Sequence, residues 1–313
     1  MTVEEPDEGL PPVAEERMAE IRRSGTWGSA LTADEFAAIR STGFEAVGQV
    51  LGAAVYNIGY TGGYICPAYG GGFGVGRIGA FGAVPYNSVT ATSGSGSLGS
   101  YAPMVRTMYA ARRAAIGRMT AECQELGGHG VVGVRLSIGS FPAGGLEFKA
   151  IGTAVRAPGA PALREPFTSD LSGQDFAKLV LAGWIPAGLV LGISIGARHD
   201  DWMTARQTSW GAGNSEVGGY TDLVNATRHD ARRQLEQDVA RHGADGVVLQ
   251  QMTIRVGEHE CPVAEGRRDH VLEATIVGTA IAHFGKPRTA KPPLAIMSLD
   301  PQRRQAARVR LGS

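Results

Sequence analysis

The sequence contains two copies of one folding unit, and this repeat limits the possible folds more than any other feature. Residues 31–53 align without gaps with residues 171–193, and eight of the 23 aligned pairs are identical. The similarity resumes between residues 127–132 and 243–248, and again at the tripeptide Gly-Thr-Ala near the end of each copy. The offset changes from 140 to 116 and then to 126. Both copies therefore share one fold and carry their insertions in different loops.

Each copy begins with a short helix that leads into a strand. Thr32 and Ser172 stand three residues before Glu35 and Asp175, which is the spacing of a capping box. A glycine follows where each helix should end. The next segments, 44–56 and 184–196, are rich in Val, Leu, Ile and Gly and are predicted to be strands, whose matched glycines indicate close backbone approach.

A longer helix and two strands complete each copy. Apolar or small residues recur every three or four positions before Gly127 and Gly243, as on the buried face of a helix. The sequence then predicts strands at 130–138 and 146–156 in the first copy, and at 246–255 and 271–283 in the second. We therefore expect an α+β protein built from two two-layer α/β units, each with the order helix, strand, helix, strand, strand.

The nineteen uncharged residues Leu179–Ala197 resemble a membrane span. The equivalent stretch of the first copy carries Arg40 and Glu45, and two copies of one fold cannot both place it in hydrocarbon. We interpret the segment as a helix end followed by a buried strand.

The composition gives little indication of an external partner. Thirty basic and thirty acidic residues give zero net charge, so we expect no nucleic-acid partner. Three cysteines, Cys66, Cys123 and Cys261, cannot all pair and suit a reducing compartment. The first residues lack the features of a secretory signal, and we expect a cytoplasmic protein. The predicted organisation is an acidic tail or helix (1–30), a first repeat (31–157), a linker (158–170), a second repeat (171–284) and a basic tail (285–313).

The repeat resembles the YbjQ-like family, whose members are often labelled as heavy-metal-binding proteins. The resemblance is carried by the first-strand glycines, by Arg-x-x-Ala on the long helix (Arg112 and Arg228), by the turns LGGHGVVGV and HGADGVVL, and by the closing Gly-Thr-Ala. It covers about residues 31–157 and 171–284. It implies a small α/β unit that assembles into a five-fold ring. A tandem chain would form either two stacked layers or one ring of ten units.

The metal label points to one group of residues in the second repeat. His259 and Cys261 would share one face of a strand, and His270 lies across the predicted hairpin. Thiolate and imidazole groups are ligands of soft transition metals. The alternative is a polar loop without a metal. Cys123 falls at a helix core position and is predicted to be a small apolar residue.

The helix-to-strand turns have a predicted structural role, carried by Gly127, His129, Gly130, Gly243, Asp245 and Gly246. Short polar side chains there can bond to backbone N–H groups. Arg112 and Arg228 are equivalent and are predicted to form salt bridges. Gly74, Gly76 and Gly79 match a dinucleotide motif, but no helix follows and the acidic residue is missing. With no other catalytic motif, we expect a non-enzymatic protein without a certain cofactor.

The loop 57–100 of the first copy is the most unusual segment. It has thirteen glycines, one charge (Arg77) and six aromatic residues: Tyr60, Tyr64, Tyr69, Phe73, Phe81 and Tyr86. Spaced aromatic side chains on a glycine-rich chain suit a contact surface. Three interpretations stay open: packing around a ring axis, binding of a partner protein, and membrane insertion by several copies. The corresponding loop 198–219 is charged.

The two tails carry opposite charge. Residues 1–20 contain seven acids and one arginine, whereas 286–310 contain seven bases and one acid. We expect solvated tails, with docking to a neighbouring chain or partner as the alternative. The sequence thus predicts a self-associating ring scaffold, expected to be a pentamer, with the loop 57–100 as its interaction surface. Metal binding and membrane activity are the alternatives.

Overall fold

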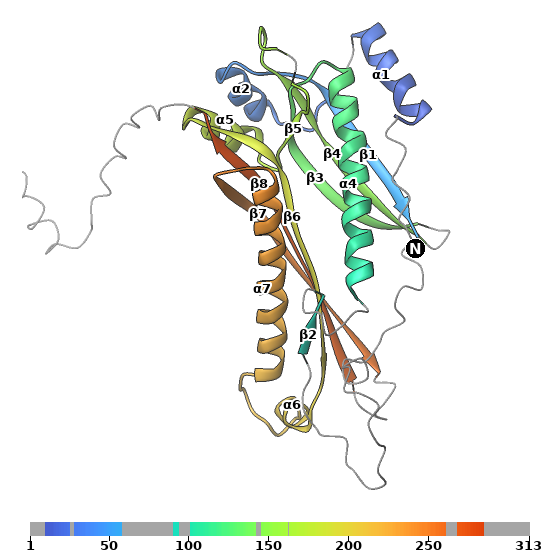
Figure 1. Ribbon diagram of the computed structural model, residues 1–313, viewed down its shortest axis with the longest axis vertical. Coiled ribbons are helices and arrows are strands. Elements are labelled where there is room, and N and C mark those ends of the chain that lie inside the picture. Colours follow the sequence, from blue (N-terminus) through green and yellow to red (C-terminus); the bar gives the residue numbers. More distant parts are fainter. Residues whose placement is uncertain are drawn as a thin grey trace, which may run out of the picture.

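The computed structural model describes residues 10–25, 28–57, 90–93, 101–141, 145–161, 163–260 and 268–284. These residues form six helices and two four-stranded sheets, so the protein is of mixed α+β class. Both repeats follow the predicted order of elements (Figure 1).

The first repeat and the segment before it contain three helices and four strands. Their bounds are α1 Pro12–Ser24, α2 Ala33–Ser41, β1 Glu45–Tyr56, β2 Thr90–Thr92, α4 Tyr101–Glu125, β3 Gly130–Phe141 and β4 Gly145–Arg156. Thr32 caps α2 through the capping box with Glu35 that the spacing predicts.

The second repeat and the segment before it contain three helices and four strands. Their bounds are β5 Phe167–Thr168, α5 Gly173–Leu181, β6 Trp184–His199, α6 Trp202–Gln207, α7 Gly218–Arg241, β7 Gly246–Glu260 and β8 Arg268–His283. Strands β7 and β8 are longer than their counterparts β3 and β4, because the second repeat carries its extra residues in this hairpin.

Each repeat lends a strand to the sheet of the other. The sheet orders are β1-β4-β3-β5 and β2-β6-β8-β7. Strand β5, from the segment predicted as a linker, runs parallel to β3 of the first repeat. Strand β2, from the loop of the first repeat, runs antiparallel to β6 of the second. Backbone hydrogen bonds therefore hold the two repeats together.

A glycine on the first strand of each repeat lets a long helix approach the sheet. A Cβ atom at Gly52 would overlap the carbonyl oxygen of Ala115 on α4, and one at Gly192 would overlap that of Ala231 on α7. An acidic residue of the same helix anchors each contact. The Leu51 N–H donates to Glu122 (2.8 Å), and the Leu191 N–H donates to Asp238 (2.9 Å).

Strand β6 is buried on both faces. Leu191 and Ile193 belong to the core around α4, whereas Val190 faces the core beneath α7. The Ile193 N–H donates to the Tyr109 hydroxyl of α4 (2.9 Å). This double burial explains the uncharged sequence of the segment. In the described part of the chain, no helix is long and apolar enough to cross a membrane.

Helix α1 occupies part of the acidic segment predicted to be a tail or helix. Met18 is fully buried, and Arg17 forms an ion pair with Glu122, the residue that anchors β1. The helix lies beside α4 in Figure 1. Part of the acidic segment is therefore packed against the first repeat.

Candidate functional site

The two repeats meet at a joint that is formed by residues 167–177 and by β3 and α2 of the first repeat. The Phe167 N–H donates to the His129 carbonyl (3.1 Å), and the Ser169 N–H donates to the Val131 carbonyl (2.9 Å). In return, the Val134 N–H donates to the Ser169 carbonyl (2.9 Å). The segment before the second repeat thus extends the sheet of the first.

An aromatic cluster fills the joint behind this strand. The Phe167 and Phe176 rings stack with centroids 5.8 Å apart, and Phe44 meets Phe176 edge to face at 5.2 Å. Ile39 and Leu171 are almost completely buried in the same cluster. Edge-to-face and stacked rings add to the apolar contact energy.

The first helices of the two repeats meet at the joint. Figure 1 shows α2 and α5 side by side at one end of the molecule. The Gly173 N–H at the start of α5 donates to Glu35 Oε1 (3.2 Å). The backbone N–H of Thr32 and this second bond hold the pKa of Glu35 below its usual value. The carboxylate thus serves two helix starts at once.

The second repeat presents the equivalent edge without a covering strand. Strand β7 lies at the edge of its sheet, and among the described residues only β8 pairs with it. Three large apolar side chains are exposed along it, namely Leu249 (48%), Met252 (43%) and Val256 (61%). This strand is therefore an open, partly apolar edge.

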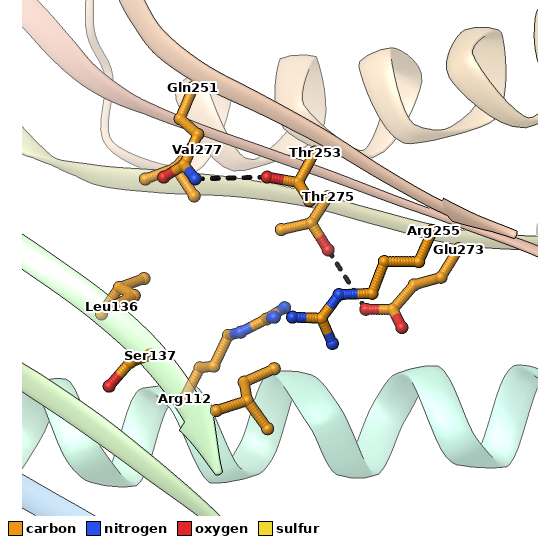
Figure 2. Close-up of a pocket in the computed structure, with 10 residues that line it drawn as sticks. Arg112, Leu136, Ser137, Gln251, Thr253, Arg255, Glu273, Thr275 and Val277 are labelled. Carbon is orange, nitrogen blue, oxygen red and sulfur yellow. Dashed lines mark hydrogen bonds between the residues drawn. The ribbon is translucent and has the colours of Figure 1, made fainter.

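A cavity of about 240 Å³ lies between α4 and β3 of the first repeat and β7 and β8 of the second (Figure 2). The guanidinium groups of Arg112 and Arg255 point toward each other in it, with the Glu273 carboxylate beside them. Arg112 is only 5% exposed, and its Nη1 makes no hydrogen bond to the described residues. Burial lowers the pKa of Arg112. The predicted equivalence with Arg228 does not extend to its surroundings, because Arg228 is exposed.

The residues of the two helix-to-strand turns occupy equivalent places. Gly127 and Gly243 have left-handed φ values of 69° and 59°. The Ala157 N–H donates to His129 Nδ1 (3.0 Å), and the His283 N–H donates to Asp245 Oδ2 (2.9 Å). Each polar side chain thus joins the start of one strand to the end of its neighbour.

The glycines that follow differ in their neighbours. A Cβ atom at Gly130 would overlap the Phe167 ring, whereas one at Gly246 would meet only Ile281, at 3.6 Å.

The predicted metal ligands are spread over the end of the β7–β8 hairpin. His259 faces Asp269 in the register and Glu258 faces His270, so the two histidines lie on opposite faces of the strand pair. The buried His270 forms an ion pair with Asp200 (3.2 Å) and lies against the Tyr220 ring. Cys261 lies outside the described residues. Within the described ranges, no three His, Cys, Asp or Glu side chains are placed to hold one metal ion.

The remaining candidates divide into buried and undescribed residues. Cys123 is fully buried, its thiol contacts the Gly130 carbonyl (3.4 Å), and burial raises its pKa to about 12. Cys66 and the dinucleotide-like glycines lie outside the described residues. So do all six aromatic residues of the loop, Tyr60, Tyr64, Tyr69, Phe73, Phe81 and Tyr86.

Residues 90–93 of the loop are described, and they are anchored to the second repeat. The Ser93 N–H donates to the Ile195 carbonyl (2.8 Å), next to the β2–β6 pairing.

Comparison with known proteins defines the family. A family model described as "Putative heavy-metal-binding" matches residues 86–158, in the first repeat. A UPF0145 protein of Clostridium perfringens is 43% identical over 60 residues, which are 19% of this chain and 54% of that protein. An encapsulin nanocompartment protein of Mycobacterium tuberculosis is 31% identical over 292 residues. The alignment covers 90% of this chain and 95% of that relative.

The chain belongs to the same family as this nanocompartment protein, and its residues 86–158 match the YbjQ-like family model. The family predicted from the repeat is thereby confirmed. The relative that shares nearly the whole chain is the nanocompartment protein, so its similarity extends over both repeats. No solved structure matches the chain significantly.

Sequence reasoning missed the joint itself. The sequence predicts a linker at residues 158–170 and a loop at residues 57–100, yet β5 and β2 lie within them. Both strands are too short to show a period of their own, so the sequence pattern carried no signal for them.

Proposed function

We propose that the protein is a non-enzymatic scaffold whose chains associate with one another into a closed ring. The observation that carries the proposal is the open edge of β7, where Leu249, Met252 and Val256 are exposed along one strand. An exposed edge with apolar side chains is a template for pairing with another chain. The resemblance to ring-forming members of the family leads us to expect five chains.

The relationship to the nanocompartment protein supports a structural role. That relative is named for a compartment, and its similarity covers 90% of this chain. The described lining of the cavity beside Arg112 contains no Cys or His, and its hydroxyl–carboxylate contact, from Thr275 to Glu273, is long at 3.4 Å. We therefore assign the architecture of the joint to assembly.

The loop 57–100 is proposed as the surface for a partner protein. Within it, the described strand β2 is paired with β6 of the second repeat. A chain that lacks residues 58–89 should form an assembly with the same number of chains as the wild type and should no longer bind the partner protein. Loss of assembly in this deletion would instead assign the loop to contacts between chains.

The native mass of the purified protein tests the scaffold directly. Five chains of 32.7 kDa are expected, both with and without EDTA. Another closed multiple of this mass would keep the scaffold and correct the ring size. A monomer over the micromolar range would overturn the proposal.

Metal binding is the alternative function, favoured by the description of the matching family model. Elemental analysis of the same sample tests it. A stoichiometric metal that is lost in Cys261→Ser but kept in Cys123→Ser would support the proposed ligands His259, Cys261 and His270. Equal metal contents in the two variants and the wild type would remove this site.

A further inference from the structure

We propose that chains join head to tail by repeating the joint found inside the chain. The β7 edge of one chain would receive residues 28–37 of a second copy, as the β3 edge receives residues 168–177. The inference rests on the proposed self-association and adds to it which two surfaces meet. It starts from the hydrogen bonds before the first helix of each repeat.

The segments before α2 and α5 are held to their own repeats by the same contacts. In each, a serine hydroxyl lies beside a threonine hydroxyl of the last strand, and the following backbone N–H groups donate to these two hydroxyls. The distances in the first repeat are Ser29–Thr153 3.1 Å, Ala30–Thr153 3.3 Å and Leu31–Ser29 3.1 Å. Those in the second are Ser169–Thr279 3.0 Å, Asp170–Thr279 3.1 Å and Leu171–Ser169 3.2 Å.

The two segments differ in their exposure, although each makes the same contacts with its own repeat. Ala177 on α5 is 4% exposed, whereas its counterpart Ala37 on α2 is an exposed residue. Thr168 is buried, whereas Gly28 is exposed. Since each segment is placed on its own repeat in the same way, the additional cover of residues 168–177 comes from the first repeat. In the described structure the counterpart positions Gly28 and Ala37 remain exposed, although Glu35 of the same segment contacts the start of α5.

The receiving surface is also duplicated. Val132 and Val155 of the first repeat are fully buried, and their counterparts Val248 and Ile281 are only partly buried. The first pair belongs to the cluster that contains Phe167, and Val248 packs against the border of the same cluster. The second repeat therefore offers a half-covered apolar surface at the position where the first holds the incoming strand.

Gly246 gives the most specific sign of a missing partner. Its counterpart Gly130 must be glycine, because the Phe167 ring of the incoming segment fills the place of a Cβ atom. Among the residues that the structure describes, Gly246 has no such neighbour, and its φ angle is not among the positive ones. A second copy of the chain, bound in the same geometry as the joint, would supply this neighbour to Gly246. In the sequence, the residue aligned with Phe167 is another aromatic, Trp27.

The occupant favoured by these observations is a second copy of this chain. The joint inside the chain already shows that a segment of this type fits an edge of this type. The contact is heterologous, so its repetition produces a closed ring or an open filament. Repeats one and two would alternate along a single path, which favours one ring of alternating units over two stacked layers.

Two surface variants test the joint from its two sides. Gly246→Ala places a methyl group where the incoming segment would lie, and Ala37→Glu places a charge on the exposed face of α2. Gly257→Ala on the same strand and Asp34→Lys on the same helix are matched controls. Gly257 has no close neighbour for a Cβ atom, and Asp34 and its counterpart Gln174 are both exposed.

Native mass spectrometry across a dilution series measures the concentration at which the assembly of each variant dissociates. The wild type and both controls should form the same assembly. The assemblies of Gly246→Ala and Ala37→Glu should each dissociate at protein concentrations at least tenfold higher than the wild-type assembly does. The circular dichroism of both variants should be unchanged. An equimolar mixture of these two variants should form a one-to-one dimer, because one intact β7 edge and one intact α2 segment remain.

The outcomes separate the joint from the scaffold. Assembly of both variants at wild-type concentrations, or a mixture that forms no dimer although each variant is folded and monomeric, would overturn the joint and leave self-association standing. A wild type that is monomeric throughout would overturn both. A wild-type monomer that binds another protein through β7 would assign the edge to a different partner and would equally overturn the joint.

Discussion

Strands β3 and β7 are the same strand in two copies of one unit, yet one is covered and the other is open. The first residues of β3 lie beneath β5 and the aromatic cluster, whereas most of β7 is exposed. Both sequences begin Gly-Val-Val, so the different burial of these first three residues does not come from their identity. It arises from the neighbouring unit, because β5 and the second repeat come directly after the first repeat in the chain. In this protein, the edge strand of a repeat is buried where another repeat packs against it.

The strongest test of this comparison is the pair Gly130→Ala and Gly246→Ala. Gly130→Ala should lower the free energy of unfolding by roughly 1–3 kcal/mol, because the new methyl group displaces the Phe167 ring. Gly246→Ala should change the stability of the dissociated chain by less than about 0.5 kcal/mol. Urea unfolding in dilute protein measures both. Equal losses would show that the two glycines have the same surroundings in solution.

A smaller difference is expected between the two turn residues His129 and Asp245. Each accepts a hydrogen bond from a backbone N–H, but His129 is buried and Asp245 is exposed. His129→Ala leaves the Ala157 N–H without its acceptor in a buried place and should cost about 1–2 kcal/mol. Asp245→Ala should cost about 0.5 kcal/mol, because water replaces the carboxylate. Urea unfolding with His129→Asn as the control distinguishes a lost acceptor from lost packing.

The sequence was sufficient for the order helix, strand, helix, strand, strand of each repeat, but it did not predict β2 or α6. The capping box at Thr32 and the glycine stops mark helix ends by local chemistry, and the doubled pattern allowed the two copies to support each other. The buried strand β6 followed from the same doubling, because its charged counterpart in the first copy excluded a membrane span. Local sequence rules and the internal repeat are therefore enough to predict the main elements of one repeat.

The contacts between the repeats could not be predicted in the same way. Strand β5 has two residues and β2 has three, so neither shows a period of its own. Which edge each joins depends on the relative placement of two units, which local propensity does not encode. The surroundings of Arg112 depend on the same placement, since Arg255 and Glu273 come from the other repeat.

The extended hairpin of the second repeat predicts a pH effect on stability. Burial raises the pKa of Asp269 to about 6, although the charge of His270 opposes this. Because the folded pKa exceeds the usual 3.8, the folded chain holds more protons between about pH 4 and pH 6, and stability falls as pH rises through this window.

The expected loss in this window is about 1 kcal/mol, reduced because the His199 ring 2.6 Å away favours the charged carboxylate. Urea unfolding of the wild type and Asp269→Asn at pH 4.5 and pH 7 measures it. The variant should lose less stability between the two pH values, and parallel losses would contradict the assignment.

The smallest effect is expected at the two equivalent arginines. Arg112 is buried above the Phe148 ring (6.0 Å to the ring centre), whereas Arg228 is exposed. Arg112→Met keeps most of the packing of the stem and removes a buried charge, so its free energy of unfolding should stay equal or rise by up to about 1 kcal/mol. Arg228→Met should lie within about 0.5 kcal/mol of the wild type. A loss above about 1 kcal/mol in Arg112→Met, present in phosphate and absent in an uncharged buffer, would show that an anion balances the Arg112 charge in solution. The cavity between the repeats would then be occupied in the folded protein, and the difference between the two arginines would reflect that ligand.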